Sequence, residues 1–366
     1  MISTESYCEE KKVKRFKTVV FFTLSVSNTN SVLSHSTQWI NEFARHCEKL
    51  HCYPVHMEKN VNLSENVQCS ELGGGSFLYR CRAIFRILNT LKVILRNRDK
   101  AVVVYHMFPA PAILIGAILK LARVPQILWY SHSSTKNGLR LASRFVDHIF
   151  TPTRNSFPLK LPEKVKVVGH GIEVGTFQPK NLEDLQMSRK DGIWVFGRIS
   201  PIKRIDVLIE AINRATISIK VLTCVGPIYD TKYFEFIKTL ANNSHIEFHH
   251  KRELEKAELA EVMLSSSITF TGSLRTLDKA AIEAALAGSF ILSDEREVLD
   301  STGMSALWGE MGFAEPPMLH TQIELLDNLA CSNAAGLQRL TISVFNAKSH
   351  SLETLVENIL RLGARV

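Results

Sequence analysis

GRISPIKRIDVLIEA, residues 197–211, is the stretch that decides the fold of this chain. The apolar run before it, residues 193–196, is typical of a buried parallel strand, and the apolar residues after it recur at helical spacing. The stretch is therefore a turn between a strand and a helix. Backbone N–H groups at the start of such a helix favour an anion, and Arg198 and Lys203 add positive charge beside them. A solvated surface turn could carry the same two cations, so the neighbouring motifs decide between a phosphate site and plain surface.

Strand-like runs alternate with helical patterns along most of the chain, which predicts parallel α/β units rather than a helical bundle or a β-sandwich. In the first half, strands are expected over residues 18–24, 53–57, 101–105, 126–130, 148–151 and 165–168. Helices are expected there over residues 34–50, 77–97, 110–122 and 139–145. Residues 58–76 have no clear pattern and are expected to form a long mobile loop. In the second half, strands are expected over residues 193–196, 219–224, 246–249, 268–271 and 290–293, and a terminal helix over residues 352–362.

Length and composition limit the class of protein. The 366 residues are 45% hydrophobic, which is enough for two cores of ordinary domain size. No apolar run reaches the roughly 18 residues that cross a bilayer, and the first residues lack a signal-peptide pattern, so a cytoplasmic location is expected. Seven scattered cysteines without a Cys-x-x-Cys pair indicate reduced thiols rather than disulfides or a zinc site.

A formal charge of +8 favours anionic partners, and part of it lies in the helix expected over residues 77–97. The apolar residues of this helix repeat along one face, which is expected to pack on the domain: Phe77, Cys81, Ile84, Leu88, Leu91 and Leu95. Arg82, Arg86 and Arg96 fall on the other side, where they form either a solvated helix back or a surface that docks on an anionic membrane leaflet. Nucleic acid is not an expected partner, because the basic segments lack interleaved aromatic residues.

Residues 197–211 resemble the donor-binding domain of the retaining glycosyltransferase family 4, in which a Gly-Arg-Leu-x-x-x-Lys-Gly-x-Asp-x-Leu-Ile-x-Ala pattern recurs. Residues 168–179, VGHGIEVGTFQP, are similar to the family's interdomain stretch, and residues 224–227, CVGP, to its next strand-end turn. Residues 273–288, SLRTLDKAAIEAALAG, resemble the second hallmark of the family, two glutamates eight positions apart. The resemblance covers most of the chain and is closer in the second half than in the first.

This resemblance implies a GT-B fold, that is, an α/β architecture of two facing Rossmann-like domains with parallel sheets and an interdomain cleft. It implies an N-terminal acceptor-binding domain at residues 1–175 and a C-terminal nucleotide-sugar donor-binding domain at residues 176–345. Residues 346–366 form a C-terminal helix that can pack back toward the N-terminal domain. Ligands of open α/β sheets bind at the carboxyl ends of the strands, so two facing halves create one site between them.

The resemblance also implies donor-binding residues. Arg198 and Lys203 match the arginine and lysine that hold the donor diphosphate in the family, and Glu283 matches the glutamate that bonds the ribose hydroxyls. An ionised carboxylate offers the acceptor atoms that a vicinal diol needs. The remaining donor-binding residues that the resemblance implies are Gly197, Arg275, Leu277, Asp278 and Lys279.

Arg275 departs from the family pattern, because it stands where the first of the two glutamates, near the donor sugar, is expected. The reversed charge means either that the sugar is held differently or that the activity has changed. The pair Asp278-Lys279 is similar to a variant pattern of some family members, which favours retained catalysis.

Three histidines are candidates for contact with the donor sugar or the acceptor. His106 and His132 each follow a predicted strand, are expected to face the cleft from its carboxyl end, and look like family sites that carry histidine. His170 lies beside the interdomain Gly171. Of these, His132 is grouped with Arg198 and Lys203 as a catalytic residue.

The function implied is that of a hexosyltransferase-type enzyme, which moves a sugar from a nucleotide-diphosphate-sugar to an acceptor hydroxyl with retention of configuration. The expected acceptor is a saccharide or a lipid-linked molecule of envelope polysaccharide or glycolipid synthesis, reached from a peripheral position on the cytoplasmic membrane face. No metal or other cofactor is expected, since the leaving diphosphate can itself accept the acceptor's proton. Hydrolase elbows, Walker loops and His-Glu-x-x-His motifs are absent from the sequence.

Two alternatives stay open. One is a non-catalytic GT-B member that binds a nucleotide-sugar or acts as a partner subunit, which Arg275 favours. The other is a nucleotide-sugar epimerase, which needs no acceptor.

Overall fold

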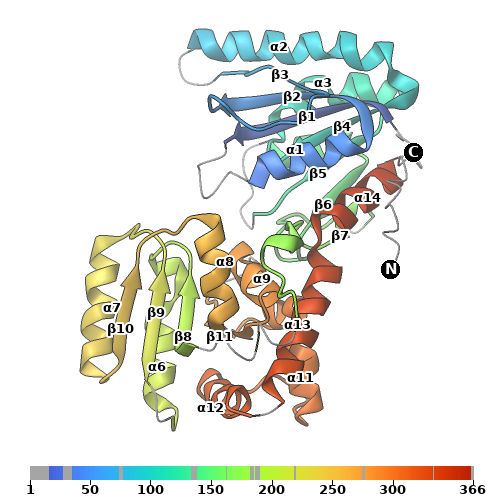
Figure 1. Cartoon of the computed structure of the whole chain (residues 1–366). Coiled ribbons are helices and arrows are strands. Elements are labelled where there is room, and N and C mark those ends of the chain that lie inside the picture. Colours follow the sequence, from blue (N-terminus) through green and yellow to red (C-terminus); the bar gives the residue numbers. More distant parts are fainter. Residues whose placement is uncertain are drawn as a thin grey trace, which may run out of the picture.

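The computed structural model describes residues 16–27, 35–73, 77–132, 138–161, 163–181, 185, 190–217, 220–273, 277–332 and 334–363. Within them the chain forms two parallel sheets, each covered by helices and each in a domain of its own (Figure 1). The expected α/β architecture of two domains with parallel sheets is therefore confirmed.

The first sheet has seven strands in the order β3-β2-β1-β4-β5-β6-β7. Their bounds are β1 Phe16–Val26, β2 Cys47–Met57, β3 Val67–Cys69, β4 Ala101–His106, β5 Gln126–Trp129, β6 His148–Thr151 and β7 Val165–Val167. The helices that cover the sheet are α1 His35–Arg45, α2 Phe77–Arg96, α3 Ala110–Leu121 and α4 Leu139–Phe145. Side chains alternate along the central strands, so that Phe21 packs toward α1 whereas Val20 and Phe22 pack toward α2 and α3.

The second sheet has five strands in the order β10-β9-β8-β11-β12. Its strands are β8 Lys190–Phe196, β9 Val221–Val225, β10 Glu247–Lys251, β11 Ser266–Phe270 and β12 Phe290–Leu292. The helices of this half are α6 Ile205–Arg214, α7 Thr231–Asn243, α8 Lys256–Ser265, α9 Lys279–Leu286, α10 Arg296–Thr302, α11 Met304–Glu310, α12 Leu319–Ala330 and α13 Ala335–His350. Most of their buried apolar side chains belong to one continuous core.

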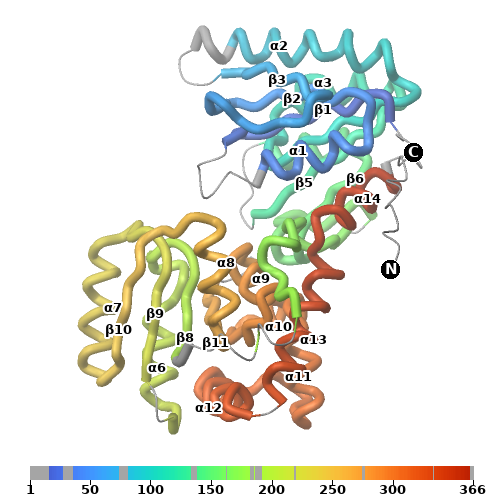
Figure 2. The backbone as a smooth tube through the Cα atoms, viewed as in Figure 1, coloured from blue at the N-terminus to red at the C-terminus, as the bar shows by residue number. Residues whose placement is uncertain are grey.

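The chain passes between the domains twice, and the two passages are joined. Ile172, on the way to the second domain, donates its N–H to the carbonyl oxygen of His350 at 2.7 Å and accepts from the N–H of Leu352 at 2.9 Å. Helix α14, Leu352–Gly363, then returns to the first domain, where Leu355 and Ile359 pack in the core beneath α1 (Figure 2). The last helix therefore ties the two domains together.

Two predictions of local structure in the first half are wrong. The helix expected over residues 34–50 ends at Arg45, because Cys47 begins strand β2 and pairs with Phe16 of β1. The segment expected to be a loop over residues 58–76 contains the short strand β3, which pairs with β2 from Leu50 onwards and is too short to show a pattern. Residues 74–76 of that segment lie outside the described residues.

The prediction of which face of helix α2 is buried is also wrong. Ile87, Thr90 and Ile94 pack onto the sheet, whereas Ile84 and Leu88 of the expected face are exposed. The side chain of Phe77 lies outside the described part of the chain. Among the described helices, none is both long and apolar enough to cross a bilayer. No disulfide joins the cysteines of the described segments.

Candidate functional site

Two turns meet at the carboxyl edge of the second sheet. Strands β8 and β11 are neighbours, and the turn after β8, with the 3₁₀ helix η3 Pro201–Lys203, lies against Gly272 after β11, where a Cβ would be 2.6 Å from the carbonyl oxygen of Lys203. At Gly197 the backbone has a φ of +110°, and a Cβ there would lie 3.0 Å from Nζ of Lys203. This glycine therefore lets the backbone turn directly against the lysine head group.

Lys203 is buried in this corner, with only 7% of its surface exposed. Its Nζ donates to the carbonyl oxygen of Phe196 at 3.2 Å and forms an ion pair with the carboxylate of Asp278. Burial pushes the pKa of the Asp278 carboxyl upward, but Lys203 and the N–H of Ala280 outweigh it and hold this pKa below its usual value. The ion pair is therefore present over the whole neutral range.

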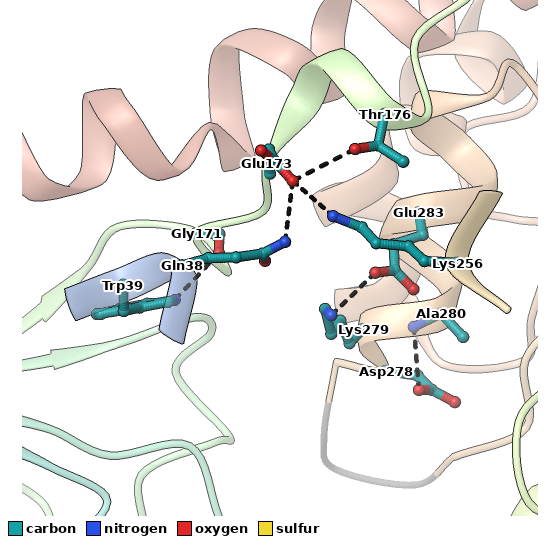
Figure 3. A network of polar contacts seen from close by, with 10 residues as sticks. All are labelled: Gln38, Trp39, Gly171, Glu173, Thr176, Lys256, Asp278, Lys279, Ala280 and Glu283. Atoms are coloured by element: carbon teal, nitrogen blue, oxygen red, sulfur yellow. Dashed lines mark hydrogen bonds and ion pairs between the residues drawn. The ribbon is translucent and has the colours of Figure 1, made fainter. Parts of the chain in front are cut away.

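The start of helix α9 supplies a second lysine and a second carboxylate (Figure 3). Asp278 caps the helix, since its Oδ1 accepts from the N–H of Ala280 at 3.3 Å. Lys279, the first helical residue, places Nζ 3.0 Å from Oε1 of Glu283 one turn further on. Glu283 is 7% exposed, so this carboxylate is held inside the protein.

His170 extends this group of charges to the passage between the domains. Burial, followed by the charges of His350 and Lys279, lowers the pKa of His170 to about 4. The N–H of His170 donates to Nδ1 of His350 at 3.1 Å. With this lowered pKa, His170 is neutral at pH 7.

His106 is at the carboxyl end of β4, as expected, but it does not face solvent. Its ring packs against Trp39, with ring centroids 4.9 Å apart, and its Nδ1 lies 3.1 Å from the hydroxyl of Thr23. Burial, followed by the charge of His170, lowers the pKa of His106 to about 3. The expectation that His106 faces the cleft is corrected here, because the aromatic side chains around it close over the strand end.

The other predicted site residues are distributed more widely. Arg198 is exposed, and its guanidinium carbon lies 5.3 Å from the centre of the Tyr229 ring. Leu277 is buried in the core of the second domain, where it anchors the start of α9. His132 is exposed beyond β5, and its backbone N–H donates to the carbonyl oxygen of Ser156 at 2.8 Å. Arg275 lies outside the described residues.

Arg204 also stands in the turn, but its charge is matched by an acidic partner. Both of its terminal nitrogens contact Asp294, at 2.9 and 2.8 Å. Its backbone is left-handed, with a φ of +50°, at the junction between η3 and α6. Arg204 is therefore held by Asp294 beside the turn, just as Lys203 is held by Asp278.

Glu173 is a residue of the domain interface that motif reasoning did not single out. Its Oε2 accepts from Gln38 Nε2 of α1 at 2.9 Å and from Lys256 Nζ at the start of α8 at 2.5 Å (Figure 3). Nearby, Nε1 of Trp39 donates to the carbonyl oxygen of Gly171 at 3.2 Å. Glu173 belongs to residues 168–179, the stretch whose sequence resembles the family's interdomain segment.

This region brings three cations and two carboxylates together. Lys203 and Lys279 lie at the positive end of a helix, each with a carboxylate partner, and Arg198 stands at the rim. Among the residues that the structure describes, no group of three or more histidine, cysteine, aspartate or glutamate side chains is arranged to hold a metal ion.

Comparison with known proteins defines the fold. No protein-family model and no curated protein sequence matches this chain. HepE from Anabaena, solved in complex with UDP and glucose, superposes with a TM-score of 0.65 and 10% sequence identity over 96% of this chain and 100% of that chain. A glycosyltransferase from Rickettsia africae superposes with a TM-score of 0.70 and 13% identity over 95% and 98% of the two chains.

WaaG, a glycosyltransferase involved in lipopolysaccharide biosynthesis, superposes with a TM-score of 0.58 and 14% identity over 94% of this chain and 99% of that chain. At these identities the likeness establishes the fold and leaves the activity to be argued from the site. The chain therefore has the GT-B fold, in agreement with the architecture implied by the motifs.

Proposed function

We propose that this chain is a retaining glycosyltransferase that takes a sugar from a nucleotide-diphosphate-sugar and adds it to an acceptor hydroxyl. The observation that carries the proposal is the pair of lysine–carboxylate contacts at the start of α9: Lys203 contacts the cap residue Asp278, and Lys279 contacts the buried Glu283 one turn further along. The resemblance of residues 197–211 and 273–288 to glycosyltransferase family 4 supports the same assignment. So does the GT-B fold, which HepE combines with bound UDP.

In this proposal the donor diphosphate lies between the two lysines and the N–H groups that open α9, with Arg198 closing the site from the rim. Gly197 leaves space for the backbone to approach the phosphates. Glu283 accepts hydrogen bonds from the ribose hydroxyls. Leu277 contributes by anchoring α9 in the core rather than by touching the donor. Arg275 stands in the sequence where the family pattern has the glutamate near the donor sugar.

The reaction needs no protein nucleophile. The bond between the anomeric carbon and the diphosphate oxygen breaks, and the bond to the acceptor oxygen forms on the same face of the sugar. The acceptor's proton passes to the departing diphosphate. Arg198, Lys203 and Lys279 stabilise the charge that develops on that leaving group, an effect worth a few kcal/mol for each preorganised donor. We expect no metal or other cofactor, since these cations supply the required charge.

The first domain, residues 1–175, is proposed to bind the acceptor, and residues 176–345 to bind the donor. His170 is neutral at pH 7, which suits hydrogen bonds to sugar hydroxyls rather than ion pairs. His106 is enclosed at the end of β4 and is assigned no contact with the sugar. His132 is the candidate on the neighbouring strand end. We propose a saccharide or lipid-linked acceptor of envelope polysaccharide or glycolipid synthesis, used on the cytoplasmic side.

A specific observation supports a second candidate function, that of a non-catalytic GT-B member that only binds the nucleotide-sugar. Lys203 and Lys279 both have carboxylate partners of their own, and Arg275 replaces the family glutamate. Thermal-shift screening against nucleoside diphosphates and their sugars identifies the donor, because a ligand of the folded state raises the melting temperature. Assays of donor hydrolysis and transfer then separate the candidates.

Turnover of the stabilising donor, with acceptor or with water, supports the enzyme. Stabilisation without any turnover supports the binding protein. A changed sugar recovered without an acceptor would instead identify an epimerase.

A further inference from the structure

Helix α2 exposes an apolar stripe on the outer side of the first domain. The stripe consists of Ile84, Phe85, Leu88 and Leu95, and Phe85 alone is 65% exposed. The opposite side of the helix, with Ile87 and Ile94, is fully used in packing on the sheet. The stripe is therefore not part of the core, and side chains of this size are seldom gathered on an exposed surface without a partner.

Cations lie beside the stripe along the same helix. At about 100° per residue, Arg96 falls almost in line with Phe85 along the helix axis, and Arg82 lies about 60° further around. Residues 77–100 contain seven lysines and arginines and one acidic residue, Asp99. The solvent-facing half of α2 thus has an apolar edge and a cationic edge, the pattern of a helix that lies in a membrane interface.

Helix α3 continues the apolar surface. It packs beside α2 on the same face of the sheet, since Ile115 and Leu119 of α3 share a core with Ile87 of α2. Its outward side carries three exposed apolar residues at helical spacing: Leu114, Ile118 and Leu121. Figure 1 shows α2 along the edge of the first domain that points away from the second domain.

Charge decides what covers this surface. A second copy of the chain would bring two sets of like charges together, which is unfavourable at an interface. An acidic bilayer complements the charge and also accepts the apolar stripe among its acyl chains. We propose that the exposed face of α2 and α3 is a docking surface for an anionic membrane leaflet.

The test is cosedimentation of the full chain with vesicles of phosphatidylglycerol and, in parallel, of phosphatidylcholine. Binding to the anionic vesicles is expected to exceed binding to the neutral ones by at least tenfold and to weaken as salt is added. The variant R96E with K92E is expected to reduce anionic-vesicle binding by more than tenfold, given about fivefold for each charge near the surface. Phe85→Gln is expected to reduce it by about tenfold through the apolar contact.

The matched control is Leu337→Gln on α13 in the second domain, where the side chain is 64% exposed, nearly as much as Phe85. This control is expected to bind vesicles as the unaltered chain does. Equal binding to both lipids, or unchanged binding of Phe85→Gln, would overturn the proposal. So would a dimer in sedimentation without vesicles that Phe85→Gln converts to monomer.

The result of the vesicle-binding experiment does not depend on whether the chain transfers a sugar. Phe85 and Arg96 lie outside the donor site, so turnover with soluble substrates is expected to be unchanged in their variants. A chain that binds vesicles without transferring sugar would contradict the proposed function and leave the docking surface intact.

Discussion

Lys203 and Asp278 form an ion pair although 75 positions separate them in the chain, and the pair occupies the corner where two strand ends meet. In the proposed function, a diphosphate has to compete with Asp278 for Lys203. The Asp278 carboxylate therefore limits donor affinity, while its ion pair holds the side chain of Lys203 in position.

Replacing Asp278 by asparagine tests this competition. The new side chain can still cap α9, because asparagine is a favourable N-cap, but it no longer neutralises Lys203. We expect the dissociation constant of the nucleoside diphosphate to fall by about tenfold, or ~1.4 kcal/mol, in isothermal titration calorimetry. Asp294→Asn, which removes the partner of Arg204, serves as the control and is expected to leave affinity unchanged. Weaker binding by Asp278→Asn would show that the carboxylate itself supports the donor.

Gly197→Ala probes the close approach of the turn to Lys203. With a φ of +110° and a new Cβ 3.0 Å from Nζ, alanine is strained at this position. We expect the free energy of unfolding to fall by about 1–3 kcal/mol in urea denaturation. Gly309→Ala is the matched control, because this helical glycine in α11 has no atom within 4 Å of the new Cβ. That change is expected to raise stability by about 0.5–1 kcal/mol. Equal effects of the two changes would contradict the packing of this turn.

Glu283→Gln tests the ribose contact. The unaltered chain is expected to bind a nucleoside diphosphate more tightly than its 2′-deoxy analogue, by about 1.5–3 kcal/mol for a hydrogen bond to a charged group. Glutamine is a weaker acceptor than the carboxylate. In competitive titrations, the free-energy preference of the variant for the nucleoside diphosphate over its 2′-deoxy analogue should therefore be less than half that of the unaltered chain. Glu297→Gln, on α10, is expected to keep the preference. A variant that discriminates as strongly as the unaltered chain would exclude Glu283 as the ribose partner.

The buried histidines predict a loss of stability in acid. In the unfolded chain His106 takes up a proton near pH 6.5, whereas in the folded chain its pKa is about 3. The unfolded state therefore binds more protons below pH 6.5, and stability falls as the pH drops from 6.5 toward 3. His106→Phe should reduce the slope of unfolding free energy against pH between 6.5 and 4.5. An unchanged slope in His106→Phe would contradict the burial of a neutral imidazole.

Local patterns were enough to predict the second sheet and the turn that opens it. In residues 193–211 the strand, the glycine turn and the amphipathic helix lie next to one another in sequence, so each signal supports the next. The first part of strand β2, before residue 53, was not predicted. Its backbone hydrogen bonds are made with β1, which is distant in the sequence, so the local pattern does not show them. Helix α2 was predicted with the wrong buried face because it carries two apolar sides, and only the position of the sheet selects between them.

The site could be predicted as a set of residue types but not as a set of contacts. Lys203, Lys279 and Glu283 could be named from their motifs, whereas the pairing of Lys203 with Asp278 depends on β8 and β11 being neighbours. The expectation that His106 faces the cleft was wrong because Trp39, from another element, packs against its ring at the strand end.

The most direct test of the proposed donor site is calorimetric titration of a neutralised pair. In the double variant Lys203→Met with Asp278→Asn both charges are removed together, so no unpaired carboxylate is left buried. We expect this variant to fold, to bind the nucleoside diphosphate at least tenfold more weakly than the unaltered chain, and to lose turnover by about 10²–10³-fold. The control is Lys238→Met, at an exposed position on α7, which should keep both the affinity and the turnover of the unaltered chain. Unaltered affinity and turnover in the double variant would contradict the assignment of Lys203 to the donor diphosphate.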